Sequence, residues 1–132
     1  MKKNIGKKAL TTLAIVLAIT ATTVFAATEA KGNFSLTYLQ WNRSGYIKLV
    51  CAYPLVEYKA QKSDNSTLKV TLSKKAYFGL GFENVDVQYT DINGNDYSYV
   101  YFDEQDAKKE YLITTLNTKK DSVANASYTF NS

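Results

Sequence analysis

Three tyrosines, Tyr97, Tyr99 and Tyr101, alternate along residues 97–101, which read YSYVY. Alternate residues of a β-strand point to the same face, so these three rings would form one row. Tyrosine combines a flat apolar ring and a hydroxyl group with only two side-chain torsions to immobilise, which suits stacking on sugars and recognition of proteins. The spacing therefore predicts a strand with one ligand-binding face.

Hydrogen-bonding side chains are expected beside this row. Asn93-Gly94 is typical of a two-residue turn, because both residues tolerate the positive φ that such a turn needs, and it predicts a β-hairpin over residues 85–102. The hairpin register puts three polar residues on the tyrosine face: Asp86, Gln88 and Thr90. It puts five apolar or aromatic residues on the core-facing side: Val85, Val87, Tyr89, Val100 and Phe102. There are two structural alternatives to a binding face. The tyrosine row could serve only to stabilise the sheet through cross-strand pairs, or it could lie buried under a second sheet or a loop.

Trp41 and Tyr46 form a second candidate ligand-binding patch. They flank residues 42–45, NRSG, whose polar residues followed by glycine are typical of a type I turn. This predicts a hairpin between residues 34–41 and 46–53 that turns Cys51 towards the core. The single cysteine is then expected to be a buried, inert thiol, the alternative being a thiol that reacts or pairs between molecules.

The composition argues against catalysis. The chain has no histidine, so it lacks an imidazole base, a serine-histidine dyad and a histidine metal site, and one cysteine cannot make a thiolate zinc site. The acids of residues 103–110 alternate with lysines in a predicted single helical turn, which indicates a solvated surface more than a glycosidase-like carboxylate pair. We expect no enzymatic activity and no cofactor.

Residues 91–96, DINGND, place acids and amides at alternate positions, as the first half of a calcium loop does. They lack the glycine of the sixth position and the glutamate of the twelfth, where Phe102 stands. Because the predicted turn accounts for the whole segment, no metal site is expected.

Residues 1–26 have the composition of a secretory signal peptide. Four lysines precede an apolar run over residues 9–24, and Val24-Phe25-Ala26 suits cleavage after Ala26. A retained membrane anchor is disfavoured, since the run is shorter than the ~20 residues that usually span a bilayer. Cleavage leaves twelve basic and twelve acidic residues, so the neutral mature chain gives no indication of a nucleic-acid partner or of stable membrane insertion.

Residues 27–132 are expected to form a single domain of eight or nine short strands. The predicted strands are residues 34–41, 46–53, 55–61, 68–72, 76–82, 85–92, 97–102, 111–116 and 123–130. Residues 62–66 would join the third and fourth strands as another hairpin. The expected alternating sets are Val56, Tyr58 and Ala60; Leu68, Val70 and Leu72; Phe78, Leu80 and Phe82; Leu112, Thr114 and Leu116; and Ala124, Ala126, Tyr128 and Phe130. This pattern predicts an all-β antiparallel β-sandwich preceded by a cleaved signal-peptide helix, with a small closed β-barrel as the alternative.

The sequence thus predicts a small, secreted, non-enzymatic binding protein. Its single cysteine and its lysine-, asparagine- and tyrosine-rich composition indicate a bacterial exported or cell-surface protein. The expected partner is a cell-surface glycan or a protein, bound by the tyrosine row, with Trp41 and Tyr46 as a second patch. Two other hypotheses remain: an antimicrobial, bacteriocin or toxin-like protein acting on cell envelopes, and a self-assembling surface or matrix protein. The sequence leaves the ligand and the oligomeric state open.

Overall fold

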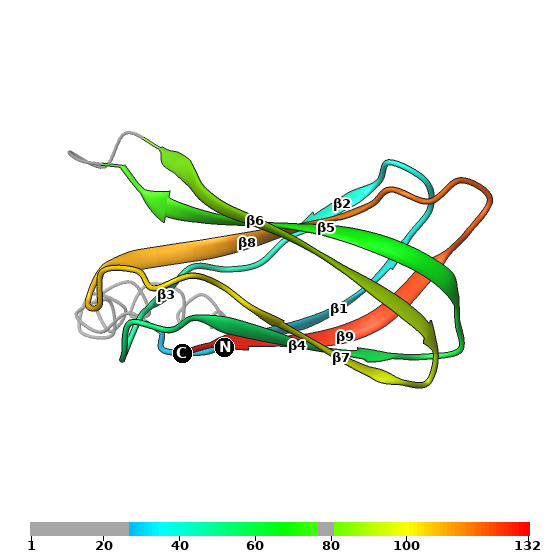
Figure 1. Ribbon diagram of the computed structural model, residues 1–132, viewed down its shortest axis with the longest axis horizontal. Coiled ribbons are helices and arrows are strands. Elements are labelled where there is room, and N and C mark those ends of the chain that lie inside the picture. Colours follow the sequence, from blue (N-terminus) through cyan, green and yellow to red (C-terminus); the bar gives the residue numbers. More distant parts are fainter. Residues whose placement is uncertain (1–26, 77–80) are drawn as a thin grey trace, which may run out of the picture.

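The computed structural model describes residues 27–76 and 81–132 (Figure 1). Its strands are β1 (Ala30–Leu36), β2 (Trp41–Arg43), β3 (Ile47–Lys48), β4 (Leu55–Ala60), β5 (Ser63–Lys75), β6 (Phe82–Gly94), β7 (Tyr97–Tyr101), β8 (Glu110–Asn117) and β9 (Ala124–Asn131). The first sheet has the order β1-β9-β4-β7 and the second the order β2-β8-β5-β6, with β3 also pairing with β8. Figure 1 shows the two sheets facing each other as two layers. The predicted antiparallel β-sandwich is confirmed; the predicted signal peptide, residues 1–26, lies outside the described residues.

The core lies between the two sheets and is built from alternate residues of their strands. As predicted, β4 contributes Val56, Tyr58 and Ala60; β5 contributes Leu68, Val70 and Leu72; and β9 contributes Ala124, Ala126, Tyr128 and Phe130. The prediction for β8 is wrong, because this strand turns Tyr111, Ile113 and Thr115 towards the other sheet and leaves Leu112, Thr114 and Leu116 on the opposite face, where Leu112 is nevertheless buried. Both sets of β8 residues alternate, so the strand period does not choose between them. The inner set also includes Asn117, whose buried side-chain amide donates a hydrogen bond of 2.9 Å to the Leu36 carbonyl.

The three predicted hairpins are wrong, because in each case the chain crosses from one sheet to the other. Strand β6 pairs along its length with β5, whereas β7 pairs with β4. The turn at residues 93–96, where the Asp96 amide bonds to the Asn93 carbonyl at 3.1 Å, therefore joins edge strands of opposite sheets. Likewise β4 and β5 lie in different sheets, and β1 pairs with β9 while β2 and β3 pair with β8. Among the described strands, β5 and β6 form a hairpin. Most of the predicted strand 76–82, which precedes β6, lies outside the described residues.

Cys51 is exposed, so the prediction of a buried thiol is wrong. Residues 49–54 form no strand; they are a loop in which the Cys51 amide bonds to the Ser132 hydroxyl at 3.2 Å. The single helical turn predicted at residues 103–110 is also absent. The amides of Gln105 and Lys108 bond instead to carbonyls of this loop, Ala52 at 2.8 Å and Leu49 at 3.0 Å.

A β-bulge in β6 changes which residues of this strand face the core. The register with β5 shifts between the pairs Leu72–Asp86 and Ser73–Asn84, so Val85 is the extra residue. An inserted residue reverses the inward and outward sets on either side of it. Val85 still packs against the core, but Val87 and Tyr89 lie on the outer face, contrary to prediction.

Candidate functional site

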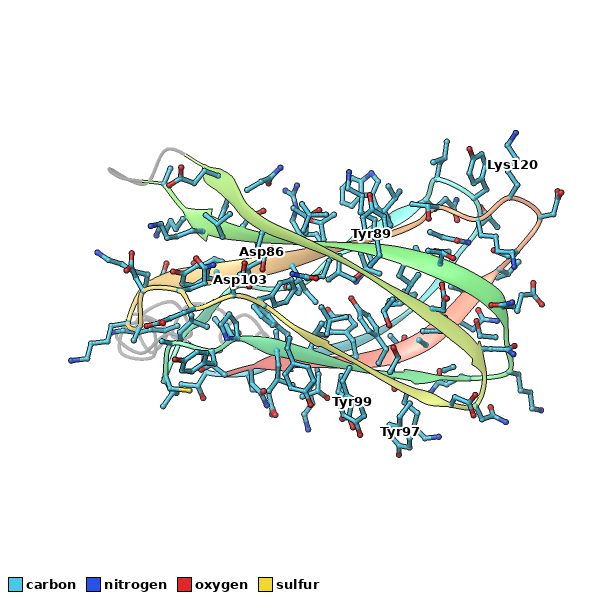
Figure 2. The ribbon with its side chains drawn as sticks, viewed as in Figure 1. Asp86, Tyr89, Tyr97, Tyr99, Asp103 and Lys120 are labelled. Carbon is cyan, nitrogen blue, oxygen red and sulfur yellow. The ribbon has the colours of Figure 1, made fainter. Side chains whose placement is uncertain are left out.

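The tyrosine face, formed by Tyr97, Tyr99 and Tyr101 of β7, is exposed on the outside of the first sheet. The three side chains are between 50 and 68% exposed, which rules out the alternative of burial under a second sheet or loop. The rings of Tyr97 and Tyr99 are nearly parallel, with planes 13° apart and centroids 6.5 Å apart. The predicted row therefore exists as an open surface at the edge of the sheet (Figure 2).

Neighbouring charges on β4 already engage this face. Lys59 pairs with Tyr97 and places its ammonium nitrogen 5.1 Å from the ring centroid. Glu57 pairs with Tyr99 and, chiefly by hydrogen bonding to its neutral hydroxyl, raises the pKa of that tyrosine. These cross-strand contacts stabilise a sheet without any ligand, so they agree equally with the alternative that the tyrosine row only stabilises the sheet.

The polar residues predicted beside the tyrosines lie elsewhere. Because of the bulge, Asp86, Gln88 and Thr90 lie on the inner face of β6, at the edge of the sandwich. They pair with residues of β5 that face the core: Leu72, Val70 and Leu68. The hydroxyl of Thr90 is hydrogen-bonded to that of Ser98, and the Asp86 carboxylate accepts a bond from the Asp103 amide at 2.9 Å. Figure 2 shows Asp86 next to Asp103 between the layers, while Tyr97 and Tyr99 point away from them. Thr90 and Asp86 therefore connect β6 by hydrogen bonds to β7 and to the residue Asp103 that follows it. The structure does not bring these polar groups together with the tyrosines.

A second exposed face lies on the outside of the second sheet. Strand pairing arranges its side chains in two rows across four strands, β2, β8, β5 and β6. One row is Trp41, Leu116, Lys69 and Tyr89, and the other is Arg43, Thr114, Thr71 and Val87. With strands ~4.8 Å apart, the Trp41 and Tyr89 backbones at the two ends of the first row are roughly 14 Å apart.

The sizes of these side chains make the face concave. Trp41 and Tyr89 are 58% and 62% exposed at the two ends of the first row, whereas Thr114 and Thr71, in the middle of the second row, are short and half-buried. The resulting depression, which we call the Trp41 groove, has a volume of about 360 Å³ and is lined by Trp41, Arg43, Lys69, Thr71, Thr114 and Leu116. That volume falls within the range of ligand sites, ~300–1,000 Å³.

The groove is polar and positively charged along part of its lining. The Arg43 guanidinium carbon lies 5.4 Å from the centroid of the Trp41 ring, a cation–π contact that orients both side chains. Lys69 enters from β5, and no acidic residue lines the groove. The site can therefore offer an aromatic surface, threonine hydroxyls and cationic hydrogen-bond donors to one ligand.

Tyr46, the other residue of the predicted second patch, lies further along the same edge of the second sheet. Its ring centroid is 6.0 Å from that of Phe82, and the Lys75 ammonium nitrogen lies 5.7 Å from the Tyr46 centroid. Lys75 also forms an ion pair of 3.1 Å with Glu110. Trp41 and Tyr46 thus share an edge, but Tyr46 belongs to this separate cluster and does not line the groove.

The sequence prediction missed seven residues of this face: Arg43, Lys69, Thr71, Val87, Tyr89, Thr114 and Leu116. Alternation identified Lys69 and Thr71 as outward-facing, but only the strand order places β5 between β8 and β6. Tyr89 was assigned to the core because the bulge carries no clear sequence signal. Trp41 was the one groove residue that its type alone suggested.

The calcium-like segment uses its oxygens within the fold. Asp91 accepts a bond from the Thr67 hydroxyl at 2.8 Å, and the Asn95 side-chain oxygen accepts one from the Lys62 amide at 2.8 Å. Among residues 27–76 and 81–132, no three acidic or cysteine side chains converge as metal ligands would. Within those same ranges, no helix is long and apolar enough to cross a membrane.

Comparison with known proteins shows a shared fold. No protein-family model and no curated protein sequence matches this chain. The structure of CBM28, a carbohydrate-binding module specific for non-crystalline cellulose, matches with a TM-score of 0.52 and 9% identity, over 76% of this chain and 71% of that one. PirA matches with a TM-score of 0.49 and 8% identity, over 76% of this chain and 93% of that one. TmCBM61, solved with β-1,4-galactotriose, matches with a TM-score of 0.43 and 7% identity, over 76% and 69%. The CBM28 match shows that this chain has the β-sandwich fold of that module.

Proposed function

We propose that this protein is a non-catalytic glycan-binding protein and that the glycan lies in the Trp41 groove. The observation that carries the proposal is the groove itself, a depression of about 360 Å³ in which an exposed tryptophan borders a floor of threonines. A sugar ring presents a C–H face that packs on an aromatic ring and hydroxyls that exchange hydrogen bonds with neighbouring polar groups. The groove supplies both kinds of contact.

The fold supports the proposal in a limited way. CBM28 has the same sandwich architecture, and that module is specific for non-crystalline cellulose. A sandwich of this architecture can therefore carry a polysaccharide-binding site. In this chain, the concave face with mixed aromatic and polar side chains is the outside of the second sheet.

The tyrosine face is a second candidate surface for the same function. Its rings are as exposed as Trp41, but Lys59 and Glu57 already contact Tyr97 and Tyr99. We therefore give the groove the main role and the tyrosine face a lesser one. A protein partner is the alternative ligand for this flat surface, since exposed tyrosines serve protein recognition equally well.

Binding to a panel of immobilised polysaccharides tests the proposal. Trp41→Ala removes the aromatic wall, and loss of such an anchor weakens binding by about tenfold or more. The matched control is the double variant Tyr97→Ala/Tyr99→Ala on the opposite outer face, which should leave the affinity within about twofold. If only the tyrosine variant loses binding, the site is the tyrosine face. If the wild-type protein binds no polysaccharide of the panel, the proposed function is wrong.

We also propose that the protein acts outside a bacterial cell or at its surface. The support is the basic and apolar composition of residues 1–26, which suits export and cleavage after Ala26. Residues 27–132 would then be the exported single domain. N-terminal sequencing of the protein recovered from culture medium tests this directly, and a start at Ala27 is the expected result.

A further inference from the structure

The Trp41 groove is a positively charged site on a chain segment with no net charge. Residues 27–132 contain twelve basic and twelve acidic residues. The groove lining nevertheless includes Arg43 and Lys69 and no acidic side chain. The positive charge at the groove is therefore a local arrangement, and not the consequence of a general excess of basic residues.

These two cations are not neutralised by the protein. Lys31, Lys74 and Lys75 form ion pairs with acidic residues, but Arg43 and Lys69 form none within the described part of the chain. Their side chains also donate no hydrogen bond to another described residue. Asp91 lies one row beyond Lys69 and Tyr89 on the same face, and its carboxylate accepts a hydrogen bond from the Thr67 hydroxyl. The groove therefore presents two cations available to a ligand.

The position of Arg43 suits it to bind an anionic group beside a stacked ring. Its guanidinium lies over the Trp41 ring, 5.4 Å from the centroid, and this cation–π contact restricts its rotamers. A guanidinium held in this way can bind a carboxylate through two parallel hydrogen bonds. Lys69 lies two strands away in the row of Trp41, so it can reach a second anionic group or the other side of the same one.

We infer that the Trp41 groove selects acidic polysaccharides, in which an anionic substituent accompanies a sugar ring. The sugar ring packs on Trp41, its carboxylate or sulfate group binds Arg43 and Lys69, and its hydroxyls meet Thr71 and Thr114. This inference rests on the proposed glycan-binding function and adds the class of glycan to it. Carboxylated and sulfated glycans share this chemistry and are distinguished by separate arms of the test.

The test compares two polymers with one backbone. Purified protein is titrated with carboxymethyl cellulose, which is acidic, and with hydroxyethyl cellulose, which is neutral, by affinity electrophoresis in low salt. We expect at least about tenfold tighter binding to the acidic polymer, as charge-assisted hydrogen bonds predict, and a loss of that preference as salt is raised. Polygalacturonate and dextran sulfate form the additional arms, and tighter binding of one than of the other identifies carboxylate or sulfate as the preferred group.

Variants separate a specific site from general charge attraction. Arg43→Gln/Lys69→Gln should bring the affinity for the acidic polymer down to that for the neutral one. The control Lys31→Gln/Lys109→Gln removes the same charge at exposed residues outside both the groove and the tyrosine face, and it should change nothing. Arg43→Lys keeps the charge but loses the paired hydrogen bonds and should lie between the two. Circular dichroism verifies that each variant folds.

Three outcomes would overturn the inference. Equal affinity for the acidic and the neutral polymer, with both lost in Trp41→Ala, would keep the proposed function and refute the acidic class. An equal effect of the control variant, or equally tight binding of a DNA duplex, would indicate unspecific attraction of anions. Absence of binding to every polymer would refute the proposed function together with the inference.

Discussion

The hydrogen bond between Tyr58 and Thr115 links the two sheets inside the core, and its removal should destabilise the sandwich. Tyr58 comes from β4 and Thr115 from β8; their side-chain oxygens are 2.6 Å apart, and each residue is at most 1% exposed. Tyr58→Phe deletes one hydroxyl and leaves the other buried without this partner, which costs about 1–3 kcal/mol. Thr115→Val should cost a similar amount for the same reason. In the double variant neither hydroxyl remains, so its loss of stability should be smaller than the sum of the single losses by about 1 kcal/mol.

Urea unfolding followed by circular dichroism measures these free energies, and pH gives a second measurement. Burial raises the pKa of Tyr58 above its ordinary value, because the charged phenolate is poorly solvated in the core. The unfolded chain then loses the Tyr58 proton above about pH 10 while the folded chain keeps it, so stability is full below pH 10 and falls at higher pH by up to about 1.4 kcal/mol per unit. Tyr58→Phe should remove this part of the alkaline loss. An unchanged urea midpoint in Tyr58→Phe, or strict additivity in the double variant, would refute the role given to this bond.

Three further predictions concern residues outside the groove. The thiol of Cys51 should react with a thiol reagent in the folded protein as fast as in urea, because it is exposed; slow reaction in the native state would contradict the loop position. Asp86→Ala should lower the free energy of unfolding by about 1 kcal/mol, since its carboxylate bonds to the amides of Val87 and Asp103, and it should not alter glycan binding; the reverse pattern would return Asp86 to the binding site. Gly32→Val should destabilise the protein by about 1–3 kcal/mol in thermal unfolding, because a Cβ at this position would come within 2.8 Å of the Tyr128 hydroxyl and overpack the core; an unchanged melting temperature would show that the Tyr128 ring moves aside without cost.

Local sequence patterns predicted the strands from β4 onwards better than β1, β2 and β3, which differ from the predicted strands 34–41 and 46–53. Alternation of apolar and polar residues depends only on the two-residue period of a strand, so it identified the core residues of β4, β5 and β9 without knowledge of their partners. The same signal could not choose between two alternating sets in β8. There the inner set contains Thr115, whose hydroxyl is satisfied by Tyr58, a residue distant in sequence.

Turn signals could not predict which strands pair. Asn93-Gly94 does form a turn, and Gly94 has a φ of 60°, as a turn glycine often has. A turn is needed equally by a hairpin and by a chain that crosses to the opposite sheet. The pairing of β6 with β5 and of β7 with β4 is decided by contacts distant in sequence.

The candidate site was predicted only in part for the same physical reasons. The strand period predicted that Tyr97, Tyr99 and Tyr101 share one face, but not whether that face is exposed, and the residue type alone pointed to Trp41. The groove needs residues from β2, β8 and β5 side by side. The face around it includes Tyr89 because of the bulge at Val85. Both depend on strand order and register, which the amino-acid sequence does not display locally.

Backbone amide shifts during a titration with a soluble oligosaccharide test the central claim most directly. The acidic oligosaccharide that binds best to the purified protein is added stepwise, and the amide signals are followed by NMR. We expect saturable shifts at residues 41–43, 69–71 and 114–116, and at the indole N–H of Trp41. Shifts confined to residues 55–59 and 97–101, on the outside of the first sheet, would contradict this claim, as would the absence of any saturable shift.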